Sequence, residues 1–147
     1  MAVRGPWVLD ASVALKWYLR DEDHLGKADL FFTAFSAGLV EIIAPTIIRH
    51  EVANGLVVAS RRGRLSPNNA GSMYSNFSRL GIGSAGEDED IILNAMRISW
   101  DFSITFYDTL YLALADQNSC NFVTADHRLY NQAKDVAQWM VWIGDVT

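Results

Sequence analysis

Residues 7–18 read Trp-Val-Leu-Asp-Ala-Ser-Val-Ala-Leu-Lys-Trp-Tyr, and the expected architecture follows from them. The first three residues form a short apolar run of the kind found in a buried strand. From Val13 to Tyr18, apolar side chains recur at helical spacing, which indicates a helix. Asp10 stands at the junction. This stretch therefore predicts a strand that leads into a helix, with a carboxylate at the turn between them.

The same alternation of apolar strands and helices continues along the chain. Further strands are expected at 41–44, 122–124 and 139–143, and Gly81–Gly83 leaves room for only a very short one. Helices are expected at 24–37, 46–59, 66–80, 84–100, 105–115 and 126–133. Strands that alternate with helices form parallel sheets covered on both faces. We therefore expect one α/β domain spanning residues 1–147. It is a three-layer α/β/α arrangement with a central, mainly parallel sheet of about five strands.

Two of these helices begin with recognisable capping signals. Ser66 precedes Pro67, which places an N-cap serine before a proline at the first helical position. Ser84-Ala85-Gly86-Glu87 matches a capping box, in which the serine and the glutamate satisfy each other's free N–H groups. The helices at 66–80 and 84–100 are therefore expected to start at these two serines.

Composition excludes several classes of protein. Of the 147 residues, 50% are hydrophobic and 12% aromatic, so a sizeable core can form. One cysteine excludes a disulfide scaffold and a multi-cysteine zinc or iron–sulfur site. No apolar run approaches the ~18 residues of a membrane span, and the first residues do not match a signal peptide. A cytoplasmic protein without membrane contact is expected.

The net charge of −5 argues against a protein that coats nucleic acid non-specifically, because such proteins are basic. A nuclease, in contrast, uses acidic side chains as metal ligands. Net charge therefore does not exclude an enzyme that acts on nucleic acid.

Four acidic residues are expected at the same edge of the sheet. Ligands of open α/β sheets bind beyond the carboxyl ends of the strands. Asp10 follows the first strand directly, and Asp126 lies just past the strand at 122–124. Asp108 opens a helix that runs antiparallel to the sheet, so it starts at that edge. Glu51 lies further along its helix, from where a long side chain can reach back.

These carboxylates have a structural interpretation as well as a functional one. Asp10, Asp108 and Asp126 all stand near helix N-termini, where aspartate is favoured as a cap or a partner of the helix dipole. A cluster of four carboxylates, however, requires protons or cations to neutralise it. Hard divalent cations such as Mg²⁺ or Mn²⁺ prefer oxygen ligands. Convergence of all four residues would therefore indicate a metal site.

Four segments of the chain resemble, in order, the motifs of PIN-domain proteins, and more narrowly the VapC ribonuclease toxins of toxin–antitoxin pairs. They are Leu9-Asp10-Ala11-Ser12-Val13, then Ala44-Pro45 with Glu51-Val52-Ala53-Asn54, then residues 107–115 (Tyr-Asp-Thr-Leu-Tyr-Leu-Ala-Leu-Ala), then Thr124-Ala125-Asp126. The third segment, in register with the others, is the most specific. Only the Gly-rich stretch around Ile82 departs from the family pattern, where the family has a short third strand.

The resemblance implies an endoribonuclease that depends on Mg²⁺ or Mn²⁺ and hydrolyses RNA with water activated by the metal. It assigns the acidic metal site to Asp10, Glu51, Asp108 and Asp126, and adds Ser12 and Thr124 as hydroxyl side chains beside it. Such a reaction leaves a 5′-phosphate and a 3′-hydroxyl. The resemblance also implies a cognate antitoxin as partner, and a homodimer.

Other classes of protein fit the sequence less well. A phosphatase of the haloacid dehalogenase type also places Asp after its first strand, but it needs a second acid two residues later, where this chain has Ser12. A phosphoacceptor receiver domain needs adjacent acids near the first strand, which are missing here. A PIN-like binding module without catalysis is the main alternative.

The first two helices carry more large apolar side chains than one sheet can cover. Phe31 and Phe32 are adjacent and therefore point about 100° apart on a helix. Either the helices pack widely against each other, or Phe32 and Trp17 line an exposed groove for a partner. The resemblance supplies the expected occupant of such a groove, an antitoxin segment.

Overall fold

The structure, a computed structural model, describes residues 3–147. The strands are β1 (Gly5–Leu9), β2 (Val40–Ile43), β3 (Asn121–Thr124) and β4 (Met140–Trp142). The α-helices are α1 (Ala11–Ala14), α2 (Leu25–Ser36), α3 (Ile47–Arg61), α4 (Pro67–Arg79), α5 (Glu89–Phe102), α6 (Phe106–Gln117) and α7 (His127–Ala133). Two short 3₁₀ helices are η1 (Leu15–Trp17) and η2 (Ile143–Asp145).

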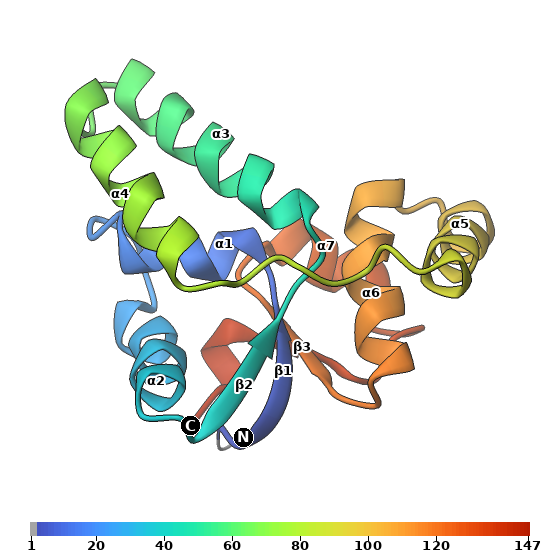
Figure 1. Cartoon of the computed structure of the whole chain (residues 1–147). Coiled ribbons are helices and arrows are strands. Elements are labelled where there is room, and N and C mark those ends of the chain that lie inside the picture. Colours follow the sequence, from blue (N-terminus) through green and yellow to red (C-terminus); the bar gives the residue numbers. More distant parts are fainter. Residues whose placement is uncertain (1–2) are drawn as a thin grey trace.

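The strands form one parallel sheet in the order β2-β1-β3-β4. Because β1 lies between β2 and β3, the chain moves outward from β1 to β2 and then crosses back over β1. Right-handed crossovers in opposite directions place their helices on opposite faces. Figure 1 accordingly shows α2 on one side of the sheet and α6 on the other. The expected three-layer α/β fold is confirmed.

The sheet has four strands in the described part of the chain, whereas about five were expected. The segment around Ile82 forms no strand, and its only sheet-like feature is a single bridge between Pro45 and Ala85. Gly81 and Gly83 both have positive φ angles, so the backbone turns on either side of Ile82. Ile82 is buried, but one apolar residue between two such glycines cannot extend a ladder.

The expected capping box is wrong. Helix α5 begins at Glu89 with Asp88 as its N-cap, and Gly86 turns the chain with a positive φ before the helix starts. Glu87 accepts a hydrogen bond from the Thr46 hydroxyl instead of bonding back to Ser84. The Ser66 cap is confirmed, since its side chain accepts the Asn69 N–H at 3.1 Å.

Helix α6 occupies the centre of the core. Seven consecutive residues, from Thr109 to Ala115, are buried, which is unusual for a helix because it usually keeps one solvated face. Tyr111 stacks on Phe122 of β3 with ring centroids 5.4 Å apart. On its other side α6 is covered by α5 (Figure 1). This burial fixes the start of α6, and with it Asp108, at the carboxyl edge of the sheet.

In residues 3–147, no helix has the length and apolar character needed to cross a membrane.

Candidate active site

Asp10 lies at the end of β1 and is buried, with 6% of its surface exposed. It occupies the N-cap position of α1, but its side chain caps no backbone N–H there. Instead its Oδ2 accepts hydrogen bonds from the hydroxyls of Ser12, at 2.6 Å, and Thr124, at 2.9 Å. The capping interpretation therefore does not explain the Asp10 side chain.

Ser12 and Thr124 connect the ends of β1 and β3. The Ala125 N–H donates to Ser12 Oγ at 2.9 Å, and the Asp126 N–H donates to Thr124 Oγ1 at 3.0 Å. Both hydroxyls thus accept from the loop after β3 and donate to Asp10. These bonds hold the Asp10 carboxylate in one orientation.

Glu51 reaches the site from the second turn of α3. Its Oε1 accepts a hydrogen bond from the Tyr111 hydroxyl at 2.6 Å, so the core helix α6 orients it. The pKa of Glu51 is raised to about 7: burial raises it most, the Tyr111 hydroxyl lowers it, and the nearby carboxylates of Asp10 and Asp108 add to the rise. The pKa of Glu51 therefore responds to the charges of Asp10 and Asp108.

Asp108 and Asp126 stand at the starts of α6 and α7. Arg128 pairs with both, its Nη2 lying 3.8 Å from Asp108 Oδ2 and 3.6 Å from Asp126 Oδ2. Asp126 also caps α7, because its Oδ1 accepts the Leu129 N–H at 3.1 Å. Helix α6 is capped by Thr105, whose hydroxyl accepts the Asp108 N–H at 3.3 Å, so the Asp108 carboxylate is not needed as a cap.

The acidic side chains oppose each other's ionisation. The pKa of Asp10 is raised to about 6: burial raises it most, the hydroxyls of Ser12 and Thr124 lower it, and Asp108 and Asp126 add to the rise. Burial also raises the pKa of Asp108 above its usual value, and Asp126 adds to this while Arg128 opposes it. A cation placed among these carboxylates would favour their charged forms.

The donor set suits a hard divalent cation, because every candidate ligand is a carboxylate oxygen. No three His, Cys, Asp or Glu side chains within residues 3–147 stand close enough together to hold one ion. This does not conflict with Mg²⁺, which usually keeps several waters and binds through one or two protein carboxylates.

Sequence reasoning did not find Tyr111, Arg128 or Lys16. Tyr111 is separated from Glu51 by 60 residues, so no local pattern links them. Arg128 follows Asp126 by two residues and could have been noticed as a counter-charge. Lys16 is buried and pairs with Glu22 at 3.3 Å, where a helix pattern would place a solvated lysine.

Comparison with known proteins places the chain in a family. The PIN domain family model matches residues 7–135. Since this match covers most of the sequence, the chain belongs to the PIN-domain family. PIN domains are generally nucleases. No curated protein matches the sequence.

Several solved structures share the fold. PAE2754 from Pyrobaculum aerophilum is 20% identical with a TM-score of 0.64, over 95% of this chain and 90% of that one. A toxin-antitoxin complex from Klebsiella pneumoniae is 14% identical with a TM-score of 0.59, over 91% and 94%. VapBC2 from Rickettsia felis, bound to a DNA fragment from its promoter, is 12% identical with a TM-score of 0.65, over 97% and 98%.

Proposed function

We propose that this protein is a metal-dependent endoribonuclease and the toxin of a VapBC-like toxin–antitoxin pair. The observation that carries the proposal is the arrangement around Asp10. Carboxylates from four distant segments interact at the carboxyl edge of the sheet, and two hydroxyls fix the central one. Membership of a family that consists generally of nucleases supports the catalytic part of the proposal.

Asp10, Glu51, Asp108 and Asp126 would hold Mg²⁺ or Mn²⁺, one or two of them directly and the others through water molecules bound to the cation. When bound, the cation would lower the pKa of a water molecule and offset the negative charge that develops on the phosphoryl oxygens. Ser12 and Thr124 orient Asp10, and Tyr111 orients Glu51, so that two of the four ligands are held in place before RNA binds. No histidine is required, and the 2′-hydroxyl of RNA is not the nucleophile.

Cleavage of a single-stranded RNA tests this function. Activity should be absent in EDTA and restored by Mg²⁺ or Mn²⁺, and the products should carry 5′-phosphate and 3′-hydroxyl ends. Undiminished cleavage in EDTA, or 2′,3′-cyclic phosphate ends, would refute the proposal. A protein that binds RNA without cutting it under any metal condition would support the non-catalytic module instead.

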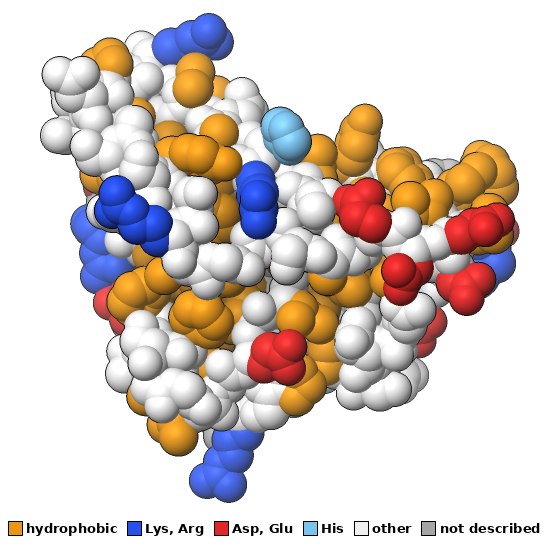
Figure 2. All heavy atoms as spheres, in the orientation of Figure 1, with side chains coloured by type: hydrophobic (Ala, Val, Ile, Leu, Met, Phe, Trp, Pro, Cys, Tyr) orange, Lys and Arg blue, Asp and Glu red, His pale blue; other side chains and the backbone are white. Residues whose placement is uncertain are grey.

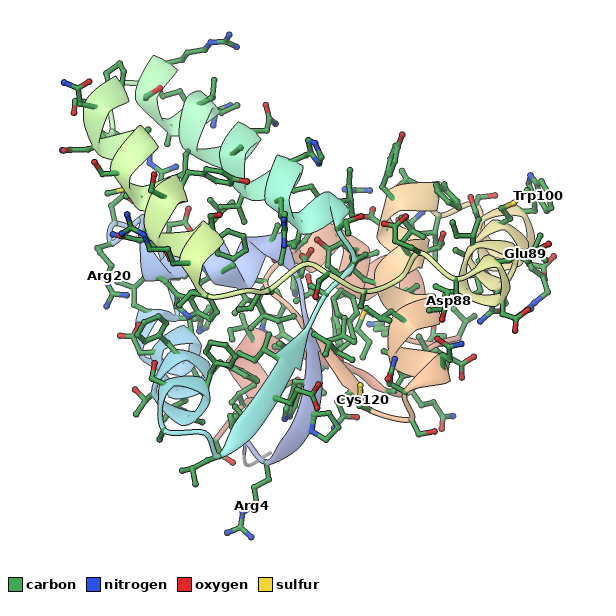
Figure 3. All side chains as sticks on the ribbon, viewed as in Figure 1. Arg4, Arg20, Asp88, Glu89, Trp100 and Cys120 are labelled. Atoms are coloured by element: carbon green, nitrogen blue, oxygen red, sulfur yellow. The ribbon has the colours of Figure 1, made fainter. Side chains whose placement is uncertain are left out.

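An antitoxin partner is supported by an apolar groove on the face formed by η1, α2 and α4. The groove has a volume of about 430 Å³, and its lining includes Trp17, Phe32 and Leu80. Phe31 packs into the core against Trp7, whereas the adjacent Phe32 is 37% exposed and meets Trp17 edge-on at 5.3 Å. The Arg20–Asp29 ion pair lies at its margin, and Figure 3 shows Arg20 on the outer side of the molecule.

The occupant proposed for this groove is an apolar segment of the antitoxin. Two of the solved structures with this fold are of a toxin–antitoxin complex and of VapBC2. A basic antitoxin side chain that reached the acidic site from the groove would compete with the metal and suppress cleavage. We also propose that the toxin forms a homodimer, which size-exclusion chromatography with light scattering would detect.

A further inference from the structure

Trp142 lies beside the acidic site without belonging to it. It is the last residue of β4 and is paired in register with Thr124, whose hydroxyl holds Asp10. Register partners on neighbouring strands are about 4.8 Å apart and project from the same face. The half-buried indole meets His127 with ring centroids 4.7 Å apart and His24 at 5.8 Å. A cluster of aromatic rings therefore stands one strand away from the carboxylates.

Gly144 makes room for the Trp142 indole, and His24 has an uncommon backbone conformation. A Cβ at Gly144 would lie 2.4 Å from Trp142 Nε1, yet the backbone of Gly144 is not in the positive-φ region that favours glycine. The glycine is therefore needed for space, not for conformation. His24 has a φ of 59°, a left-handed conformation that costs energy for a residue with a side chain.

The cluster opens onto a cavity that adjoins the active site. The cavity has a volume of about 370 Å³ and is lined by Lys16, Asp21, Glu22, Asp23, His24, Ala125 and Trp142. Ala125 connects it to the site, since the Ala125 N–H binds the Ser12 hydroxyl. Lys16 and Arg64 pair with Glu22, and Arg64 also pairs with Asp21, which reduces the net negative charge of this wall. Both carboxylate oxygens of Asp21 and of Glu22 accept from Arg64 or Lys16, so Asp23 is the carboxylate of this wall that these two cations leave open to a ligand.

We propose that this cavity binds one nucleobase of a single-stranded RNA, next to the phosphate that is cleaved. The base stacks on Trp142, and its N–H groups donate to the carboxylate of Asp23. Guanine, which presents N–H donors at N1 and N2, suits this wall better than uracil, whose single N–H lies between two carbonyls. This proposal adds a base-binding subsite to the proposed nuclease function, and it rests on that function for the identification of the ligand as single-stranded RNA.

Binding measured without metal tests the subsite independently of catalysis. Fluorescein-labelled uridine hexamers, with or without one central guanosine, are titrated with the protein in EDTA at low ionic strength, and Kd is read from fluorescence anisotropy. Base–aromatic stacking predicts that Trp142→Ala weakens binding about tenfold. Trp142→Phe keeps a stacking face and should stay within about threefold of the wild type.

Two further variants distinguish the loss of stacking on Trp142 from the effect of replacing any tryptophan. Gly144→Ala keeps Trp142, but the added Cβ would displace its indole ring. This variant should therefore weaken RNA binding as Trp142→Ala does. Trp100 is the matched control, because it is 74% exposed on α5 and points outward there (Figure 3). Trp100→Ala should bind as the wild type does, and circular dichroism would check that each variant is folded.

The outcomes distinguish this proposal from the nuclease function. Tighter binding of the guanosine-containing hexamer, lost in Trp142→Ala and Gly144→Ala but kept in Trp142→Phe, supports the subsite even if the wild type cuts no RNA. Equal affinities of wild type, Trp142→Ala and Trp100→Ala overturn it, even if the wild type cleaves RNA with Mg²⁺. Equal binding of the two hexamers overturns the preference for guanine.

Discussion

Burial and hydrogen bonding shift the pKa of Asp10 in opposite directions. Removal from water raises the pKa of this carboxyl to about 6, although Ser12 and Thr124 both donate to its Oδ2. An aspartate whose pKa is raised by folding costs stability when it is charged at neutral pH, here up to about 3 kcal/mol. A residue that weakens the fold in this way is typical of a functional site.

Asp10→Asn should therefore abolish metal-dependent cleavage while leaving the metal-free protein as stable as the wild type, or more stable. The amide oxygen can still accept from both hydroxyls, and the repulsion by Asp108 and Asp126 is relieved. The melting temperature in EDTA and the cleavage rate with Mg²⁺ measure the two effects.

Glu89→Gln is the control for this substitution. Figure 2 shows acidic side chains gathered over the start of α5, and Figure 3 places Asp88 and Glu89 there, away from the sheet edge. Loss of one negative charge at Glu89 should leave cleavage unchanged. If Asp10→Asn cleaves RNA at the wild-type rate, Asp10 is not part of the catalytic site.

The candidate site could be predicted in part from the sequence. Asp10 and Asp126 were placed at the sheet edge because they directly follow apolar runs, which is local information. The Tyr111–Glu51 hydrogen bond joins α6 to α3 and the Arg128 ion pairs join α7 to α6, so both depend on how helices pack. Such long-range contacts leave no periodic pattern in the chain.

At the scale of elements, α2 divides its aromatic side chains between two environments. Phe31 is fully buried against Trp7 of β1, and Phe32 lies in the groove with Trp17 of η1. The 100° rotation between adjacent helical residues makes this division unavoidable. One aromatic residue thus stabilises the domain, and the next remains available for a partner.

Phe32→Asp should weaken binding of the cognate antitoxin at least tenfold and leave the rate of RNA cleavage nearly unchanged. A charge in an apolar groove would be desolvated when the partner binds, whereas the groove lies apart from the carboxylates. Isothermal titration calorimetry measures the affinity.

Leu39→Asp is the matched control for the groove. Leu39 is 74% exposed in the turn after α2 and does not line the cavity, so its substitution should not affect antitoxin binding. Should Phe32→Asp bind the antitoxin as tightly as the wild type while folded, the partner uses another surface.

The start of a helix could be predicted where its capping residues are close in sequence. The prediction was wrong where a contact from a distant part of the chain replaced the local cap. The Ser66–Pro67 helix start is satisfied within one turn and is confirmed. The capping box at Ser84 failed because Thr46 binds Glu87 from another part of the chain. The expected short strand near Ile82 failed because two glycines turn the backbone there.

At the scale of the whole molecule, the α3–α4 pair extends beyond the carboxyl ends of the strands on one side, and the α5–α6 pair lies on the other side (Figure 1). Buried residues from all the strands and from helices on both faces form one continuous core. We propose on this ground that the chain forms a single domain.

Unfolding in urea should therefore be a single cooperative transition. A domain of this size with one core is expected to unfold in two states. Far-UV circular dichroism and tryptophan fluorescence should give the same midpoint, because Trp7 is in the core and Trp100 reports on the surface of α5. Two separated transitions would contradict a single cooperative core.

Titration of Mn²⁺, followed by electron paramagnetic resonance of the free ion, tests most directly whether the carboxylates around Asp10 form a metal centre. Wild type and Glu89→Gln should take up Mn²⁺ at a saturable site, and Asp10→Asn should weaken that binding at least tenfold. Equal Mn²⁺ binding by Asp10→Asn and the wild type, or no saturable binding by the wild type, would contradict the account.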